Sequence, residues 1–224
     1  LPDTFGWDAD RIDSTIDFII LGMHARAENP ELLRAKELGI KIYSFPEYVY
    51  EHSKNKTRIV VGGSHGKTST TAMMMHALIN RNIDFDYLVG SQLEGFETMV
   101  KLSDAPIIVI EGDEYLTSPL DLKPKFHWYK PHVAILTGIA WDHINVFPTY
   151  EIYLEQFRIF IDSIEKGGTL IYCEEDADLK QMAIQAICKK IPYTVPEYRI
   201  TDGETRVKTG GNEYQLNVFG KHNL

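Results

Sequence analysis

The chain has 224 residues, which is enough for one large domain or for one and a half. Its hydrophobic content of 44% and charged content of 25% are ordinary for a globular protein, and no apolar run approaches the ~20 residues that a membrane span requires. Lysine and arginine number 23 against 32 acidic residues, a net charge of −9, and without a basic block this balance argues against nucleic acid or an anionic membrane as a partner.

The first residues and the cysteines indicate the setting of the protein. The chain begins with residues 1–4, Leu-Pro-Asp-Thr, without an initiating methionine or a signal-peptide pattern, which indicates an interior piece of a longer protein. Cys173 and Cys188 are far apart and form no CxxC pair. We interpret them as reduced thiols of a cytosolic protein, with a disulfide or a metal site as the alternative.

Residues 1–56 contain strands and helices in alternation. The apolar run 17–22 predicts a buried strand, and a helix follows over 29–38, with asparagine as its N-cap and proline at its first helical position. A strand over 41–43 and a helix over 46–52 complete the run. About fifty residues are too few for a complete doubly wound domain, so we expect the latter part of one.

Two charged side chains, His24 and Arg26, follow the first predicted strand. Open α/β sheets bind ligands at the carboxyl ends of their strands, so both residues are candidate ligand contacts. Solvated loop charges are the alternative. The polar residues 53–56 then predict a linker into a second domain, which we place at 57–224.

The most informative segment is residues 62–68, Gly-Gly-Ser-His-Gly-Lys-Thr, between a β-rich run and a predicted helix over 67–81. Glycines let backbone N–H groups approach phosphate oxygens, and the start of a helix attracts anions. Lys67 is placed to reach the β- and γ-phosphates, and the Thr68 hydroxyl to join a Mg²⁺ site. The loop is a short GxxGK[ST] form, because Val61 stands where the longer pattern has glycine; a tight turn before a capped helix is the alternative.

A second buried strand, 106–110, ends in Glu-Gly-Asp-Glu at 111–114. Before it we expect a strand at 86–89 and one short helix at 96–102. A carboxylate at a strand tip beside bound phosphates offers the hard oxygen ligand that Mg²⁺ prefers. Glu111 continues directly from the strand and is the better-placed ligand; a solvated acidic turn is the alternative.

A third strand, 132–137, leads to Asp142 and His143. A histidine at that position can bind a metal or a phosphate oxygen, or can simply cap the next turn. Thr149 caps the helix that follows, which ends before Gly167. We interpret the apolar face of this helix as core rather than as a cofactor site: Tyr153, Phe157, Phe160, Ile161 and Ile164.

The remaining residues alternate again and then change character. We predict a strand at 169–173, a helix over 176–189 and a short strand at 193–195. A turn at 209–212 is followed by apolar residues that alternate with polar ones, which is typical of a hairpin with one wet face: Tyr214, Leu216 and Val218.

In combination these motifs resemble the Mur ligases of bacterial peptidoglycan synthesis. The resemblance covers most of the chain, in motifs at residues 29–31, 62–70, 111–115 and 220–223. It implies an α/β protein of three domains: a Rossmann-like UDP-sugar domain, a central P-loop ATPase domain, and a domain for the incoming amino acid or peptide. The chain would hold the latter part of the first (1–56) and most of the second (57–224) of a cytoplasmic bacterial enzyme, without the third.

The resemblance also implies the chemistry. A ligase that uses ATP and Mg²⁺ would transfer the γ-phosphoryl group to the lactyl carboxylate of UDP-N-acetylmuramate, and an amine would then displace phosphate. The implied catalytic residues are Lys67, His65, His143 and Glu114, and the implied metal ligands are Thr68, Glu111 and His143. The implied ATP contacts are Gly63, Ser64, His65, Gly66, Lys67, Thr68, Ser69, His222 and Asn223, and the UDP-sugar contacts are His24 and Arg26.

Two groups within the family fit the sequence. Tyr115 after the acids, together with Lys125-Phe126 and the later Tyr129, is similar to members that attach L-alanyl-γ-D-glutamyl-meso-diaminopimelate in peptidoglycan recycling, which we favour. Members that add L-alanine are the alternative. Gly138 stands where many members have asparagine, which puts a nucleotide contact by that asparagine in doubt.

Two other classes of protein would use the same loop. A small-molecule kinase or a GTPase-like switch makes no amide bond, and it has no need for residues 1–52. A non-catalytic nucleotide-binding or UDP-sugar-binding module would not need an intact set of catalytic and metal-binding residues: Lys67, Thr68, Glu111 and His143.

Overall fold

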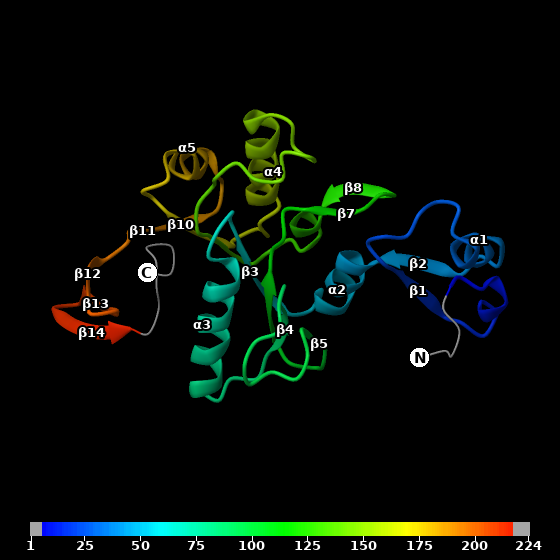
Figure 1. The fold of residues 1–224 in the computed structure, drawn as a ribbon, viewed down its shortest axis with the longest axis horizontal. Coiled ribbons are helices and arrows are strands. Elements are labelled where there is room, and N and C mark those ends of the chain that lie inside the picture. The colour runs from blue at the N-terminus through cyan, green and yellow to red at the C-terminus, as the bar shows by residue number, and fades with distance from the viewer. Residues whose placement is uncertain (1–5, 217–224) are drawn as a thin grey trace.

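A seven-stranded sheet forms the centre of the computed structural model, which describes residues 6–216 (Figure 1). The strand order is β11-β10-β9-β3-β6-β4-β5, and every pair is parallel except β4 with β5. The strands are β3 (Thr57–Gly62), β4 (Asp86–Leu88), β5 (Val100–Lys101), β6 (Ile107–Glu111), β9 (Val133–Leu136), β10 (Thr169–Cys173) and β11 (Lys189–Tyr193). The chain is therefore an α/β protein with a mixed sheet.

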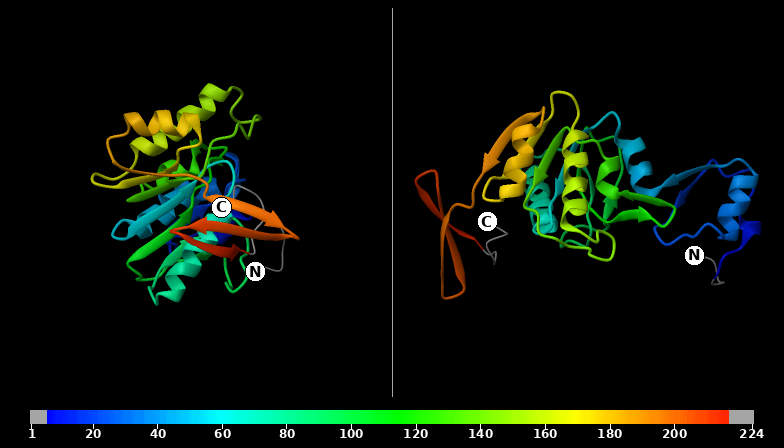
Figure 2. Two further views of the ribbon diagram at one scale, coloured as in Figure 1. Left: turned by 90° about the vertical axis from the view of Figure 1, so that its left-hand side faces the viewer. Right: turned by 90° about the horizontal axis from the view of Figure 1, so that it is seen from above.

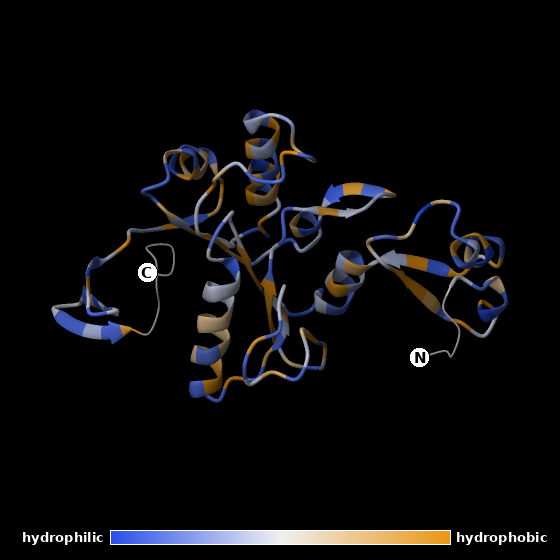
Figure 3. Ribbon diagram, viewed as in Figure 1, coloured by the Kyte–Doolittle hydropathy of each residue, from blue (hydrophilic) through white to orange (hydrophobic). Residues whose placement is uncertain are grey.

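Successive residues of β3 and β6 point to opposite sides of the sheet. Both faces therefore carry apolar side chains, and helices cover each of them. Helix α3 (Lys67–Asn80) packs Met75 against Val109 on one face. The other face carries the larger core, in which Val60, Ile108 and Ile110 are fully buried. That core is closed by α2 (Phe45–Ser53), the 3₁₀ turn η2 (Lys125–Trp128), α4 (Tyr150–Asp162) and α5 (Ala177–Gln185). Figure 3 shows the apolar inner strands of this layered arrangement.

A smaller unit lies at one end of the elongated molecule (Figures 1 and 2). It pairs two parallel strands, β1 (Phe18–Leu21) and β2 (Lys41–Ser44), with α1 (Pro30–Glu37) and the short turn η1 (Ala9–Arg11). The Asn29 side chain caps α1, as the sequence predicts, by accepting a hydrogen bond from Leu32 N.

Helix α2 contacts both parts of the molecule. Its Tyr48 ring stacks on Phe18 of β1 at 5.2 Å, whereas Val49 is fully buried in the central core. The connection from α2 into β3 is held by the buried Arg58, which forms an ion pair with Glu165 at 2.8 Å. The Arg58 guanidinium also donates to backbone carbonyls on both sides of the connection, at residues 53, 54, 129 and 130. The predicted linker is thus a short, anchored turn.

A three-stranded antiparallel sheet lies at the opposite end of the molecule, formed by β12 (Glu197–Thr201), β13 (Glu204–Thr209) and β14 (Asn212–Leu216). The predicted hairpin is therefore present with an additional strand; Val218 lies outside the described residues. No helix among residues 6–216 combines the length and apolar character needed to cross a membrane.

Four local predictions were wrong or incomplete. The strand predicted as buried at 17–22 is β1, but its Phe18 and Ile20 side chains are exposed, because no layer fully covers that face within the described residues. Residues 96–102 form a bend and then β5 instead of a helix, because the Phe96 ring packs edge-on against Tyr87 and β5 pairs with β4. Helix α5 ends at Gln185, and the strand predicted at 193–195 is β11, which starts at Lys189 in register with β10. The sequence analysis did not predict the small hairpin of β7 (Leu116–Ser118) and β8 (Asp121–Pro124).

We expect Arg58→Met to lower the free energy of unfolding by about 3 kcal/mol, because it leaves several buried carbonyls without a donor. Arg158→Met is the matched control, since its ion pair with Glu155 is exposed and its loss should cost less than about 0.5 kcal/mol. Urea denaturation of both variants measures the difference. Equal midpoints for the two variants would contradict the role of Arg58 as an anchor.

Candidate phosphate and cation site

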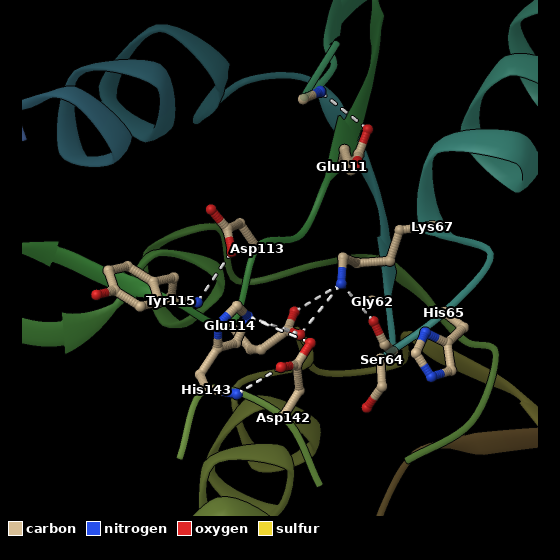
Figure 4. Close-up of polar contacts among 12 residues, drawn as sticks. Gly62, Ser64, His65, Lys67, Glu111, Asp113, Glu114, Tyr115, Asp142 and His143 are labelled. Atoms are coloured by element: carbon tan, nitrogen blue, oxygen red, sulfur yellow. Dashed lines mark hydrogen bonds and ion pairs between the residues drawn. The ribbon is translucent and has the colours of Figure 1, made fainter. Parts of the chain in front are cut away.

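Three loops meet at one edge of the central sheet. Strand β3 lies between β9 and β6, and all three run parallel, so their carboxyl ends lie side by side. The glycine loop follows β3, the acidic residues follow β6, and Asp142 and His143 lie beyond β9. Figure 4 shows the side chains of Lys67, Glu114, Asp142 and His143 converging, with Glu111 apart from them at the top of the view. The sheet order thus joins the three motifs that the sequence analysis singled out separately.

The glycine loop has the backbone that an anion site needs. Gly63 (φ +122°) lies so close to the β9 loop that an added Cβ would be 2.3 Å from Thr137 Oγ1. Gly66 (φ +78°) is the N-cap of α3 and makes no side-chain cap hydrogen bond, so the first N–H groups of the helix have no capping side chain. A cavity of about 520 Å³ is lined by residues 64–69. The loop is therefore shaped to receive a phosphate group.

Lys67 connects the loop to the acids beyond β6. Its Nζ donates to Gly63 O at 2.7 Å and to Glu114 Oε1 at 3.1 Å, and it lies 2.9 Å from Glu114 Oε2. The Glu114 side chain is fully buried, whereas 16% of the Lys67 side chain is exposed. Lys67 therefore neutralises a buried carboxylate and still reaches the cavity of the loop.

A second carboxylate is fixed beside Thr68. The Thr68 hydroxyl donates to Glu111 Oε1 at 2.7 Å, and the backbone N–H of Gly90 donates to Glu111 Oε2 at 2.9 Å. A Cβ at Gly90 would lie 3.0 Å from Glu111 Oε1, so this close approach suits glycine. The hydroxyl and the carboxylate are the hard oxygen donors that Mg²⁺ takes beside a bound polyphosphate.

Glu114, Asp142 and His143 form a second group of potential cation ligands. One ligand atom from each lies within 4.8 Å of the others, and His143 Nε2 is 3.6 Å from Glu114 Oε1. Glu114 Oε2 is buried without a correctly oriented hydrogen-bond donor, even though Lys67 Nζ is close. An unsatisfied buried carboxylate oxygen beside a histidine fits a divalent cation, since a cation would supply the missing partner.

His143 is held in a constrained position. Its backbone has φ +53°, an uncommon value for a residue other than glycine, and its N–H donates to Asp142 Oδ1 at 2.6 Å. The Tyr115 ring packs edge-on against the imidazole at 5.0 Å, and Tyr115 Oη accepts a hydrogen bond from Asn145 Nδ2. These contacts direct the imidazole toward Glu114.

A larger cavity, of about 630 Å³, adjoins this group and extends to the small unit. The small unit contributes residues 20–23, and the start of α2 contributes Phe45 and Pro46. The central part contributes Lys67, Glu111, Asp113, Lys125, Asp142 and His143 among others. Lys125 Nζ lies 2.6 Å from Asp113 Oδ2. Burial would raise the pKa of Asp113, but the hydrogen bond and charge of Lys125, the Tyr115 N–H and the charge of Lys67 together outweigh it, so this pKa lies below its usual value. The wall facing the small unit is therefore charged.

Not all predicted contacts lie at this centre. His65 is exposed, lines the loop cavity, and has its ring on the far side of the loop from Glu114 and His143 (Figure 4). His24 lines a separate cavity of about 330 Å³ in the small unit, and Arg26 is exposed. Of the remaining predicted loop contacts, residues 64 and 66–69 line the loop cavity and Gly63 does not, while His222 and Asn223 lie outside the described residues.

Two contributors to the site were not found by sequence reasoning. Gly90 directly follows the strand predicted at 86–89, where no site residue was predicted, and Tyr153 lies in the apolar face that was interpreted as core. Tyr153 is fully buried, yet its hydroxyl lies 2.9 Å from Ser64 Oγ and donates to Glu114 Oε1 at 3.2 Å. Burial, and then the nearby Glu114, raise the pKa of Tyr153 above the usual tyrosine range. The one feature of the sequence that could have indicated this role is a tyrosine hydroxyl in a helix face made otherwise of aliphatic residues and phenylalanine.

Comparison with known proteins gives a consistent result. Residues 61–224 match the Mur ligase middle domain. The UDP-N-acetylmuramate–L-alanine ligase of Desulforamulus reducens is 30% identical over 233 residues, covering 98% of this chain and 49% of that protein. The UDP-N-acetylmuramate–L-alanyl-γ-D-glutamyl-meso-2,6-diaminoheptandioate ligase of Haemophilus influenzae is 28% identical over 229 residues, covering 97% of this chain and 51% of that protein.

A solved structure gives the same relationship at the level of the fold. The UDP-N-acetylmuramate:L-alanyl-γ-D-glutamyl-meso-diaminopimelate ligase from Neisseria meningitides superposes with a TM-score of 0.84 at 24% identity, covering 97% of this chain and 74% of that chain. The chain spans about half the length of the curated relatives it matches.

We expect Gly90→Ala to weaken Mg²⁺ binding about tenfold in the presence of ATP, because the added methyl group displaces the Glu111 carboxylate from Thr68. Gly22→Ala is the control, since a Cβ there meets no atom within 4 Å. Calorimetric titration of Mg²⁺ into each ATP-saturated variant measures the effect. Identical affinities in the two variants would show that Gly90 does not set the position of Glu111.

Proposed function

We propose, from the premise that this chain belongs to the Mur ligase family, that it is the nucleotide-binding part of an ATP-dependent ligase. The full enzyme would join the amine of an amino acid or peptide to the lactyl carboxylate of UDP-N-acetylmuramate. The observation that supports this most is the meeting of Lys67, Glu111, Glu114 and His143 around one glycine loop. This arrangement suits phosphoryl transfer to a carboxylate, since the Lys67 ammonium group can bind phosphate and the carboxylates of Glu111 and Glu114 can bind metal ions.

The domain assignment is part of the proposal. Residues 1–56 would be the latter part of the UDP-sugar domain, and residues 57–224 would be the central ATPase domain. The parallel β1-β2 pair and the cavity of about 630 Å³ between the two parts support this division. The amine would be supplied from a third domain beyond this chain.

Amide formation needs an activated carboxylate, because oxide is a poor leaving group. A carboxylate oxygen attacks the γ-phosphorus of ATP, the bond to the β-phosphate oxygen breaks, and ADP leaves. The amine nitrogen then attacks the carbonyl carbon, the C–O bond to phosphate breaks, and the amine gives up a proton to water. Bound Mg²⁺ would neutralise the phosphate charges and draw the two reactants together.

The residues of this chain have distinct parts in that chemistry. Lys67 would turn from Glu114 toward the transferring phosphoryl group, which would bind in the loop cavity that the same side chain lines. Thr68 and Glu111 would hold one Mg²⁺, and His143 with Glu114 would hold a second. The tight loop around Gly63 would hold the phosphates in place with backbone N–H groups.

The proposed sugar contacts come from two cavities. The cavity between the two parts would receive the sugar, and its carboxylate would then lie near Lys67 and His143. His24 and Arg26 remain proposed UDP contacts, from the cavity in the small unit and the surface beside it. His65 would reach the sugar carboxylate only after a rotation of its side chain, because its ring now lies on the far side of the loop.

For the amine we propose the tripeptide L-alanyl-γ-D-glutamyl-meso-diaminopimelate, with L-alanine as the alternative. The residues behind this choice have clear structural roles. Tyr115 packs on the metal-binding His143, and Lys125 and Tyr129 line the cavity that faces the small unit. Both groups of ligase occur among the relatives, so the identity of the ligation product distinguishes the two amine substrates.

We expect Lys67→Ala in the full-length enzyme to lower turnover about a hundredfold or more, because the charge that stabilises the transferring phosphoryl group is lost. Lys166→Ala, at an exposed lysine, is the control and should keep normal turnover. Phosphate release in the presence of UDP-N-acetylmuramate and amine measures the rate. Near-normal ligation by Lys67→Ala would contradict the assignment of the glycine loop as the phosphate-binding site.

Product mass identifies the reaction. The full-length enzyme is incubated with UDP-N-acetylmuramate, MgATP and either L-alanine or the tripeptide, and the products are read by mass spectrometry. We expect the tripeptide adduct; an alanine adduct would move the enzyme to the other group. Phosphorylated sugar nucleotide without any adduct would favour a kinase and contradict the ligase proposal.

A further inference from the structure

We propose that Tyr153 is a positioning residue of this site: its hydroxyl joins Ser64 of the glycine loop to Glu114 and so sets the carboxylate that would bind the second cation. The inference rests on the proposed function, because it concerns the same cation site. Tyr153 itself would touch neither nucleotide nor sugar, since it is fully buried.

The tyrosine reaches the site from the core side. The Tyr153 ring, on helix α4, packs edge-on against Phe157 at 5.2 Å and in a tilted arrangement against Phe147 at 5.4 Å. The ring therefore has little freedom to rotate, and its hydroxyl is fixed at the end of a rigid arm. That hydroxyl lies between Ser64 Oγ, at 2.9 Å, and Glu114 Oε1, at 3.2 Å. A residue needed only for packing would be served as well by phenylalanine, which occupies neighbouring positions of the same stripe.

The direction of the hydrogen bonds follows from the donors available. A carboxylate can only accept, so Tyr153 Oη donates to Glu114, and the single Ser64 hydroxyl proton is shared between Tyr153 Oη at 2.9 Å and Ala140 O at 2.7 Å. Ser64 Oγ in turn accepts from the backbone N–H of Ala140 at 2.8 Å. The result is one chain of donors that runs from the β9 loop, through the glycine loop, to the buried carboxylate. Bonds in such a chain strengthen one another in a low-dielectric interior.

The chain also explains how Glu114 is oriented. Oε1 accepts from Tyr153 and Lys67, whereas Oε2 has no correctly oriented donor. Two donors thus hold Oε1, which lies 3.6 Å from His143 Nε2, and Oε2 keeps its capacity to bind a cation although Lys67 Nζ is 2.9 Å away. Without the tyrosine hydroxyl, Ser64 would satisfy itself on Ala140 O, which lies 2.7 Å away, and Glu114 would lose a fixed donor. The carboxylate could then rotate, at a cost in cation affinity.

The test compares two tyrosine hydroxyls on the same helix. Tyr153→Phe removes the hydroxyl at the site, and Tyr150→Phe removes one that donates to Asp178 at 2.6 Å, away from the site. Binding of Mn²⁺ to the full-length protein with ADP is measured by electron paramagnetic resonance, which needs no turnover. Thermal unfolding of the same samples reports folding.

We expect Tyr153→Phe to weaken Mn²⁺ binding about tenfold, as for other residues that orient a metal ligand, and Tyr150→Phe to leave it unchanged. The shift in thermal midpoint should be no larger for Tyr153→Phe than for Tyr150→Phe. Ser64→Ala should weaken binding in the same direction, because it removes the preceding donor of the chain.

Two results would overturn the inference. Wild-type Mn²⁺ affinity in Tyr153→Phe would show that the hydroxyl does not position Glu114. Equal losses in both tyrosine variants would show that the helix acts only through stability. Absence of ADP-dependent Mn²⁺ binding in the wild-type protein would instead contradict the proposed function, and the inference with it.

Discussion

The contact between Lys67 and Glu114 is the interaction on which the site depends. It joins the first residue of α3 to the loop beyond β6, and it places a cation against a fully buried carboxylate. Such a carboxylate is costly to bury without a partner, so the loop beyond β6 is held against the glycine loop in the free protein. The other candidate ligands are arranged around this pair, with Thr68 and Glu111 on one side and Asp142 and His143 on the other.

The order of strands makes this contact possible. Strand β3 pairs with β6 on one side and β9 on the other, so three segments that are up to about eighty residues apart end at one edge. The core beneath that edge also contributes. Helix α4 supplies the Tyr153 hydroxyl, and η2, which begins at Lys125, places its Phe126 in the core. The polar site and the apolar core therefore share residues, and a change in the packing of α4 is expected to shift the Tyr153 hydroxyl at the site.

Much of this was predictable from the sequence, for local reasons. The glycine loop, the capped helix α1 and the acids after an apolar strand each carry their signal within a few neighbouring residues. The contributions of Gly90 and Tyr153 depend on contacts between distant segments, which periodicity does not encode, and the stripe that contains Tyr153 is indeed core. The helix prediction at 96–102 failed for the same reason, because the conformation of this segment is set by pairing with β4 and by packing on Tyr87 rather than by local propensity.

A double-mutant cycle on Lys67→Met and Glu114→Gln tests the central contact most directly, with the free energy of unfolding of the ligand-free protein as the measured quantity. Each single substitution leaves a buried group without its partner, whereas the double substitution leaves neither charge. We therefore predict a double variant more stable than the sum of the single effects, with a coupling energy above about 1 kcal/mol. Additivity within about 0.5 kcal/mol would contradict the claim that this pair holds the site together.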